Sequence, residues 1–130
     1  MKTVTAAILR HDDRILLARR SDGSQAGRWE FPGGKVEPGE TDEACLAREL
    51  REELGIDTEI GALFAESIYT YEAGRIRLRA YEVRWLSGAL RAVVHDRLEW
   101  VPAGELLRYD MLPADVPIAE KLQQCMSSAP

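Results

Sequence analysis

The chain has 130 residues, of which 45% are hydrophobic and 30% are charged, and its formal net charge is −5 at pH 7. These values are typical of one globular domain, so we expect residues 1–130 to form a single domain. An acidic chain lacks the basic surface that binding to polymeric nucleic acid requires. No apolar run approaches the roughly 18 residues of a membrane-spanning helix, and no apolar signal segment follows Met1. We therefore expect a cytoplasmic protein without a membrane partner.

The chain begins with segments that are typical of β-strands. Residues 3–9 and 14–18 are rich in apolar and β-branched side chains, and His11 falls in the turn expected between them. A polar, glycine-containing loop covers residues 19–28. Residues 29–31 then alternate as a short strand does. The start of the chain therefore predicts two strands, a loop and a third, shorter strand.

The next segment has the pattern of a loop, a helix and a second loop. Gly33-Gly34 and Pro38-Gly39 bracket a stretch that we expect to be irregular. Thr41 stands where an N-cap residue belongs, and Gly55 stands where a glycine ends a helix. We expect a helix over residues 41–54.

One face of this helix carries a cluster of acids. Glu49, Glu52 and Glu53 are related as i, i+3 and i+4, so we expect their carboxylates to converge. Hard oxygen ligands suit magnesium or manganese better than zinc. The alternative is a solvated acidic face that is held by ion pairs with Arg48 and Arg51.

The second half of the chain predicts further strands and a final helix. We expect strands at 58–72, 76–86 and 98–101, a helical turn at 102–105, a helix at 115–125 and a frayed tail at 126–130. Asp115 is expected to be the N-cap of the final helix. This order of elements fits an α+β fold in which a mixed sheet has helices on both sides.

The stretch 34–56 combines Gly34, Glu40, Arg48-Glu49-Leu50, Glu52-Glu53 and Gly55-Ile56. With these residues it resembles the Nudix box at every defining position. The wider chain is similar to the MutT-type nucleoside triphosphate pyrophosphohydrolases of the Nudix family. The resemblance implies the Nudix fold, an α/β/α sandwich with a central mixed sheet. It also implies magnesium-dependent hydrolysis, with manganese as a substitute, that releases a nucleoside monophosphate and pyrophosphate.

The resemblance further implies a role in sanitising the nucleotide pool. The expected substrates are cytosine nucleotides (CTP, dCTP and 5-methyl-dCTP) or oxidised nucleotides such as 8-oxo-dGTP. One alternative is a Nudix hydrolase of another nucleoside diphosphate derivative, such as ADP-ribose or a dinucleoside polyphosphate. Another is a Nudix domain that binds nucleotides without catalysis. The partner in each case is a small-molecule nucleotide, and the sequence leaves open whether the chain is a monomer or a homodimer.

Catalytic and metal-binding roles follow from the same resemblance. It places magnesium on Glu49, Glu52, Glu53 and a backbone carbonyl of the glycine pair, which we assign to Gly33. Arg48 is expected to orient a carboxylate through a bidentate pair, and Glu40 to brace the loop. Water attack at phosphorus needs a proton acceptor, which is either Glu52 or Glu53.

Four residues are candidates for binding the nucleotide. Arg19 occupies a position that contacts the nucleotide in MutT-type enzymes, although it can equally be a surface arginine near Asp22. Asp115 stands where MutT reads the base; an ionised carboxylate there only accepts hydrogen bonds and prefers an amino group such as cytosine N4. Phe31 and Tyr71 offer stacking faces, with core or edge-strand packing as the alternative.

The chain departs from the family pattern at one point. Many relatives carry a further glutamate in the loop before the penultimate strand, where this chain has Val94. Either His95 or Asp96 replaces that acid from a shifted loop, or the enzyme works without it. We favour the interpretation that His95-Asp96 forms a plain turn.

Overall fold

The structure is a computed structural model that describes residues 1–127. Within this range the elements are β1 (Lys2–His11), β2 (Arg14–Arg20), β3 (Trp29–Glu30), β4 (Gly33–Lys35), α1 (Asp42–Leu54), β5 (Asp57–Tyr71), β6 (Gly74–Ser87), β7 (His95–Pro102), the 3₁₀ helices η1 (Ala103–Arg108) and η2 (Pro113–Asp115), and α2 (Val116–Ser127). We expected residues 126–130 to form a frayed tail, but helix α2 continues to Ser127. The rest of that expectation, for residues 128–130, lies outside the described residues.

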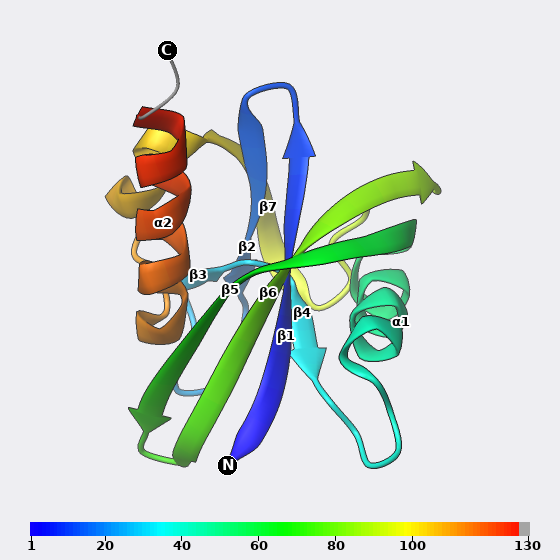
Figure 1. Cartoon of the computed structure of the whole chain (residues 1–130), viewed down its shortest axis with the longest axis vertical. Coiled ribbons are helices and arrows are strands. Elements are labelled where there is room, and N and C mark those ends of the chain that lie inside the picture. The colour runs from blue at the N-terminus through cyan, green and yellow to red at the C-terminus, as the bar shows by residue number, and fades with distance from the viewer. Residues whose placement is uncertain (128–130) are drawn as a thin grey trace.

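Strand β1 connects the two halves of a mixed sheet (Figure 1). It pairs in parallel with β6 over most of its length, and antiparallel with β4 at its beginning and with β2 at its end. Strand β2 pairs with β3 and β7, and β6 pairs with the long strand β5. The observed sheet confirms the mixed topology expected from the order of elements.

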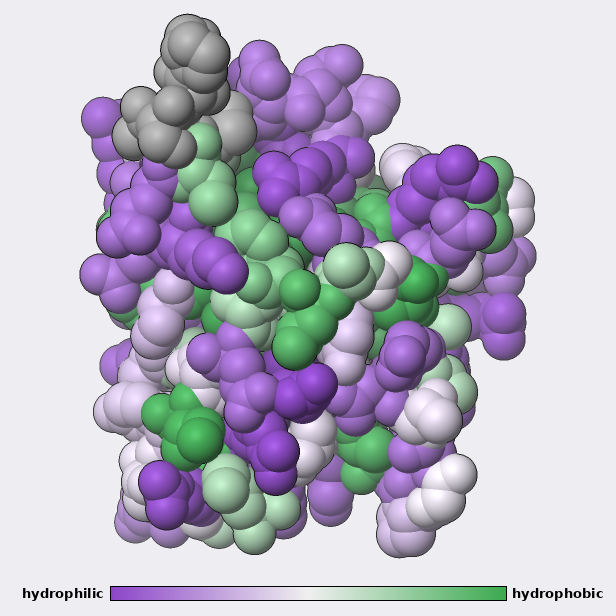
Figure 2. Space-filling model, viewed as in Figure 1, coloured by the Kyte–Doolittle hydropathy of each residue, from purple (hydrophilic) through white to green (hydrophobic). Residues whose placement is uncertain are grey.

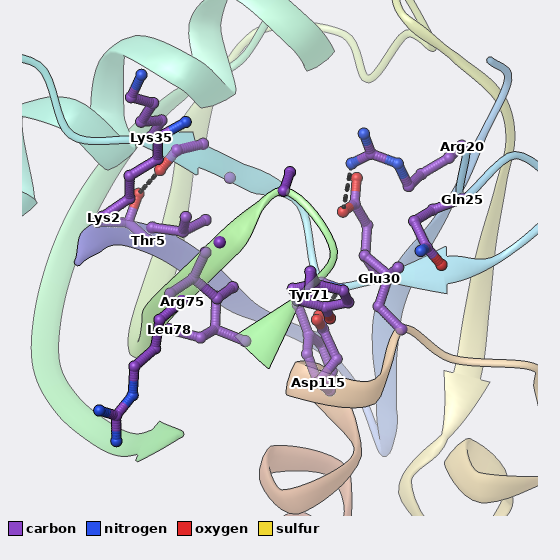
Figure 3. Close-up of a pocket in the computed structure, with 18 of the residues that line it drawn as sticks. Lys2, Thr5, Arg20, Gln25, Glu30, Lys35, Tyr71, Arg75, Leu78 and Asp115 are labelled. Carbon is purple, nitrogen blue, oxygen red and sulfur yellow. Dashed lines mark hydrogen bonds and ion pairs between the residues drawn. The ribbon is translucent and has the colours of Figure 1, made fainter. Parts of the chain in front are cut away.

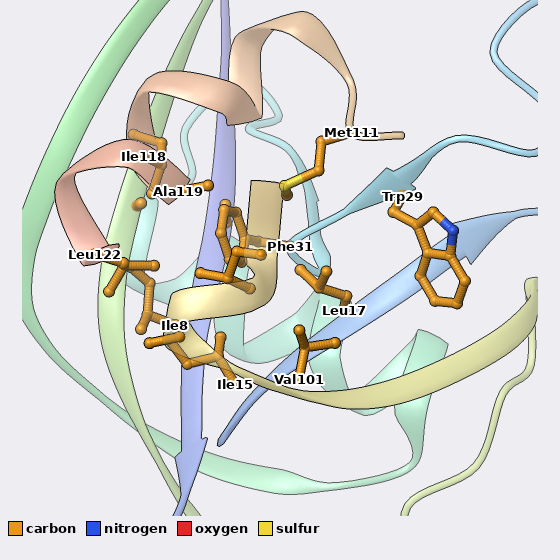
Figure 4. Packing of buried hydrophobic residues seen from close by; sticks show 14 of the residues in the cluster. Ile8, Ile15, Leu17, Trp29, Phe31, Val101, Met111, Ile118, Ala119 and Leu122 are labelled. Carbon is orange, nitrogen blue, oxygen red and sulfur yellow. The ribbon is translucent and has the colours of Figure 1, made fainter. Parts of the chain in front are cut away.

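Helices cover both faces of the sheet, as the alternation of side chains along β1 shows. Ala6 and Ile8 point into the core that includes Ile118 and Leu122 of α2 (Figure 4). The intervening residues Ala7 and Leu9 point to the opposite side, where the leucines of α1 pack. Because side chains alternate along a strand, one apolar run supplies both cores. The α/β/α sandwich is therefore confirmed.

Helix α1 begins and ends as the sequence predicts. The Thr41 hydroxyl accepts a hydrogen bond from the Ala44 backbone N–H at 3.1 Å, and Gly55 adopts a left-handed conformation with φ of 72°. Leu46 and Leu50 are fully buried against the sheet. Since packing on one face fixes the rotation of a helix, the opposite face must carry its glutamates toward the outside of this core.

Two local expectations were wrong. Gly33–Lys35 is a short strand rather than part of an irregular loop, and His11 ends β1 rather than lying in the turn. A Cβ at Gly33 would lie 2.0 Å from the carbonyl oxygen of Thr5, so glycine is what allows the chain to approach β1 closely enough to pair. Composition marked these glycines as loop residues because the pairing partner is 29 residues away.

The surface in Figure 2 is a mixture of hydrophilic and apolar residues. Strand β5 contributes exposed apolar side chains, including Leu63, Ile68 and Tyr69. Among residues 1–127, no helix is both long and apolar enough to span a bilayer. The oligomeric state, either a monomer or a homodimer, remains a prediction. The single-domain organisation of residues 1–130 also remains a prediction.

Candidate active site

A cavity of about 860 Å³ opens where several elements meet. Its wall is formed by α1, the β3–β4 segment, the turn between β5 and β6, and the residues before α2. Figure 3 shows Arg20 and Glu30 together on one side and Lys2, Thr5 and Lys35 on another. Tyr71 and Asp115 lie between these two groups in the same view. The cavity is large enough for a small ligand of nucleotide size.

Arg48 holds the acidic face of α1 in place. Its guanidinium makes a bidentate pair with Glu40, with Nε at 2.7 Å and Nη2 at 3.0 Å from the two carboxylate oxygens. The same guanidinium lowers the pKa of Glu40 to about 2. Glu40 also accepts the backbone N–H of Glu37 at 3.1 Å, which braces the loop before α1. The expected bidentate pair and the expected bracing contact are therefore both present.

The three glutamates of the cluster occupy different environments. Glu49 and Glu53 line the cavity, whereas the Glu52 side chain is 59% exposed and lies 3.2 Å from Arg48 Nη1. Arg48 also contacts Glu49, at 3.0 Å. Among the described residues, no three acidic, histidine or cysteine side chains lie close enough to hold a metal ion as they stand. Glu49 and Glu53 therefore lie together at the cavity, and Arg48 Nη1 links Glu49 to the more exposed Glu52.

Glu53 is the most perturbed of these acids. Its Oε2 atom is buried, and no hydrogen-bond partner for it is present among residues 1–127. Burial, followed by repulsion from Glu49 and Glu30, raises the pKa of Glu53 to about 8. A buried carboxylate oxygen without a partner is costly and favours a bound cation.

The glycine pair lies directly against Glu49 of this cluster. Thr5 and Gly34 are Cα partners in the β1–β4 ladder, and the flanking partners Val36–Thr3 and Ala7–Pro32 are hydrogen-bonded. Because bonding alternates along an antiparallel pair, the Gly33 carbonyl points away from β1. A Cβ on Gly34 would lie 2.2 Å from Cδ of Glu49. Glycine at position 34 therefore leaves the space that the Glu49 carboxylate occupies.

These residues fit a hard divalent cation. Glu49 and Glu53 supply oxygen ligands beside the glycine pair, and Glu52 lies one helical turn along the same face. Oxygen-only donor sets of this kind suit magnesium and manganese.

Gly34→Ala tests the packing of Glu49 against the glycine pair. We expect kcat to fall about ten- to hundredfold, because the new methyl group displaces a carboxylate whose position matters on the scale of an ångström. Thermal unfolding should change little, since position 34 needs no left-handed backbone. Gly104→Ala is the matched control, because no atom lies within 4 Å of the added Cβ there. Unchanged kcat in Gly34→Ala would show that Glu49 is free to move without consequence.

Asp115 also lines the cavity and is almost completely buried, with 4% exposure. Its carboxyl accepts the backbone N–H of Phe31 at 3.0 Å rather than capping α2. The N-cap expectation was wrong because Asp115 belongs to η2, and a residue inside a helical turn lacks the extended backbone of an N-cap. Burial, followed by repulsion from Glu30, raises the pKa of Asp115 well above its usual value. Burial therefore acts against the ionised form that we assumed from the sequence.

The two aromatic candidates both line the cavity. Phe31 is only 2% exposed and belongs to the core on the α2 side, so most of its ring packs inside the protein. Tyr71 is half-buried, and its hydroxyl accepts the Ala114 backbone N–H at 2.9 Å. Tyr71 thus offers the more accessible aromatic surface beside Asp115.

Arg19 is not among the residues that line the cavity. Its Nε donates to Asp96 at 2.8 Å, and its guanidinium lies 5.7 Å from the Trp29 ring centroid. As the alternative to nucleotide binding, we expected Arg19 to be a surface arginine near Asp22, whereas its observed partner is Asp96. The next residue, Arg20, lines the cavity instead and pairs with Glu30 at 3.1 Å.

The segment where relatives carry a further acid has a different structure from the expected turn. His95 and Asp96 begin β7, and Val94 before them is 52% exposed. The hydrogen bonds of Asp96 and His95 go to Arg19 and Glu30, not to the glutamates of α1. The turn expectation was wrong because β7 begins at His95, earlier in the chain than its apolar pattern indicates, and His95 pairs with Arg20 of β2.

Sequence reasoning missed Glu30 and Arg20. Glu30 lies in the cavity and contacts Arg20 at 3.1 Å and His95 at 2.9 Å. The one available signal was a charged residue between two aromatic residues, Trp29 and Phe31, in a short apolar strand. Its partners were not predictable because they come from two other strands.

The comparison with known proteins identifies the class to which this fold and site belong. Residues 1–122 match the NUDIX domain model, and the chain belongs to this family. The family assignment made from the box is confirmed.

Named relatives cover nearly the whole chain. The CTP pyrophosphohydrolase of Escherichia coli K12 is 42% identical over 131 residues, covering 100% of this chain and 97% of that protein. The 8-oxo-dGTP diphosphatase of the same organism is 33% identical, covering 93% of this chain and 95% of that protein. The solution structure of the E. coli ORF135 protein is similar with a TM-score of 0.89 at 42% identity, covering 100% of this chain and 94% of that chain. The crystal structure of a MutT NUDIX hydrolase from Burkholderia pseudomallei is similar with a TM-score of 0.83 at 31% identity, covering 92% of this chain and 95% of that chain.

Proposed function

We propose that this protein is a magnesium-dependent nucleoside triphosphate pyrophosphohydrolase that releases a nucleoside monophosphate and pyrophosphate. The observation that carries the proposal is the buried Oε2 of Glu53, which has no hydrogen-bond partner among residues 1–127, beside Glu49 in a cavity of nucleotide size. The names of the two E. coli relatives support the same reaction class. In a cell this activity would sanitise the cytoplasmic nucleotide pool.

The residues present can carry the roles that the reaction needs. Glu49, Glu52 and Glu53, with the Gly33 carbonyl, would hold the cation at the phosphate end of the cavity. A bound magnesium ion supplies charge neutralisation at the phosphates and a water of lowered pKa. Glu53, or Glu52 at the rim, accepts the proton of the attacking water. Arg48 keeps Glu49 and Glu52 in position through its contacts at 3.0 and 3.2 Å.

Asp115 and Tyr71 would bind the base at the opposite end. A neutral Asp115 offers a hydroxyl donor on one oxygen, while the other oxygen accepts from Phe31 and can accept a second bond. This pair complements cytosine, whose N3 accepts and whose N4 amino group donates. The name of the CTP pyrophosphohydrolase relative supports cytosine nucleotides. The same pair complements O6 and N7–H of an oxidised guanine, which supports 8-oxo-dGTP as the second candidate.

Metal removal gives the direct test of this function. We expect wild-type protein to release monophosphate and pyrophosphate from a nucleoside triphosphate in Mg²⁺, to lose this activity in EDTA and to regain it when Mg²⁺ or Mn²⁺ is added back. The measurement is product separation by chromatography over a panel of normal, methylated and oxidised (d)NTPs, ranked by kcat/KM. ADP-ribose and dinucleoside polyphosphates are included as rival substrates. Nucleotide binding without hydrolysis of any panel member would instead indicate a non-catalytic domain.

A further inference from the structure

A carboxylate outside the Nudix box is fixed in the cavity by two cationic or polar partners. Glu30 accepts Arg20 Nη1 at 3.1 Å on one oxygen and lies 2.9 Å from His95 Nε2 through the other. The Glu30 side chain is 15% exposed and that of His95 is 5% exposed. Arg20 Nε and His95 Nδ1 are also buried, and no partner for either is present in the described part of the chain. This group is more than a surface ion pair.

A β-bulge brings the two partners of Glu30 together. Along β2 and β7, Arg19 pairs with Arg97 and Arg20 pairs with His95, so Asp96 is the extra residue. Residues directly opposite each other project to the same face of a sheet. Without the bulge, Asp96 would stand opposite Arg20, and His95 would be directed away. Bulges next to functional sites commonly redirect a side chain in this way.

Glu30 lines the same cavity as Glu53 and Asp115. Its negative charge raises the pKa of Glu53 at the phosphate end and that of Asp115 at the base end. Figure 3 shows the Glu30 side chain reaching to Arg20, to which a dashed line joins it. If a nucleotide spans from Asp115 to Glu53, its sugar is the part that passes Glu30.

The chemistry of this carboxylate selects its ligand. A carboxylate only accepts hydrogen bonds, and two of its roughly four lone-pair positions are taken by Arg20 and His95. The sugar of a nucleotide presents hydroxyl donors at the 2′ and 3′ carbons, and carboxylates bind ribose hydroxyls in other nucleotide sites. We propose that Glu30 binds a sugar hydroxyl of the substrate and that His95 and Arg20 are positioning residues for this carboxylate. The proposal rests on the proposed function and adds a specificity-determining residue to it.

The test compares substrates that differ by one hydroxyl. Wild-type protein is assayed with CTP, 2′-deoxy-CTP and 3′-deoxy-CTP, and the binding of the three corresponding monophosphates is measured by calorimetry. We expect removal of one of the two hydroxyls to lower kcat/KM and monophosphate affinity about ten- to hundredfold, because a hydrogen bond to a charged acceptor is lost. A loss with 2′-deoxy-CTP identifies the 2′ hydroxyl as the group that Glu30 binds, and a loss with 3′-deoxy-CTP identifies the 3′ hydroxyl.

Two variants link that loss to Glu30. In Glu30→Gln the penalty for the missing hydroxyl should shrink to a few-fold, and in Glu30→Ala it should approach onefold. Glu82→Gln is the matched control, because Glu82 makes a two-bond pair with Arg10 on the exposed surface and should keep the wild-type penalty. Thermal unfolding of each variant is measured in parallel, and the Gln variant serves if the Ala variant does not fold.

His95→Gln tests the positioning role separately. We expect it to reduce the hydroxyl penalty by raising KM for CTP while kcat changes less, because Glu30 loses one of the contacts that hold it. A hydroxyl penalty that is the same in wild type and both Glu30 variants, or that is absent from wild type, overturns the inference alone. Failure of the wild type to hydrolyse any nucleoside triphosphate overturns the proposed function and this inference with it.

Discussion

Glu53→Gln is expected to lower kcat by a factor of about 10² to 10⁴ while the fold is retained. The magnitude is that of losing a general base or a carboxylate ligand from a phosphoryl-transfer site. Glu53 is the box glutamate whose Oε2 is buried without a partner in the described part of the chain, and it lies beside Glu49 in the cavity. Because the raised pKa already leaves most of this carboxyl protonated at neutral pH, glutamine changes its charge little, and the midpoint of thermal unfolding should stay close to that of wild type.

The comparison with Glu52→Gln sharpens this result. Glu52 is 59% exposed and contacts Arg48, and we expect its variant to lose turnover by orders of magnitude as well, but less than Glu53→Gln. Glu59→Gln on the exposed part of β5 is a control for the loss of one negative charge. Steady-state kinetics and circular dichroism on the purified variants provide the measurement. Near-normal turnover in both box variants would remove the catalytic assignment.

Asp115→Asn is expected to keep the substrate ranking and most of the activity, whereas Asp115→Leu should lose about a hundredfold in kcat/KM. Asparagine offers a carbonyl acceptor and an N–H donor, which is the pair that a neutral carboxyl offers. Leucine is branched at the same position but is larger and has neither group, and it also leaves the Phe31 N–H without its 3.0 Å partner. If Asp115 instead worked as an ionised acceptor, asparagine would change the preferred base. Kinetics on the (d)NTP panel distinguish these outcomes.

Asp115→Asn should also alter how the free energy of unfolding depends on pH. The pKa of Asp115 is raised in the folded protein, first by burial and then by Glu30, while Arg20 and the Phe31 N–H act in the opposite direction. The folded state therefore holds this proton to a higher pH than the unfolded state, in which Asp has a pKa of about 3.9. Its contribution to stability is fully present below that value and is lost as pH rises through the folded-state pKa.

Asp115→Asn removes this titration. Relative to wild type, its free energy of unfolding should rise as the pH increases from about 4, where the unfolded aspartate ionises, up to the raised folded-state pKa. Urea unfolding in EDTA at several pH values measures the difference directly. A difference between variant and wild type that stays constant over this range would contradict burial as the cause.

The elements predicted best from the sequence were those whose signals are local. Thr41 and Gly55 marked the ends of α1, and the spacing of its leucines gave the buried face. Those signals depend on residues within one or two helical turns. Gly33–Lys35 was predicted poorly because its strand conformation depends on Thr5, which lies far away in the sequence. The same reason explains why His95 was assigned to a turn.

The sequence by itself determined that Glu49, Glu52, Glu53 and Arg48 share one helix face, because helical periodicity places residues three and four apart together. Only the tertiary structure decided that Asp115 is buried against Phe31, 84 residues away, and that Glu30 is held by His95 across 65 residues. Burial and distant partners set whether an acid is neutral, exposed or fixed. These properties arise only when strands from different parts of the chain pack together.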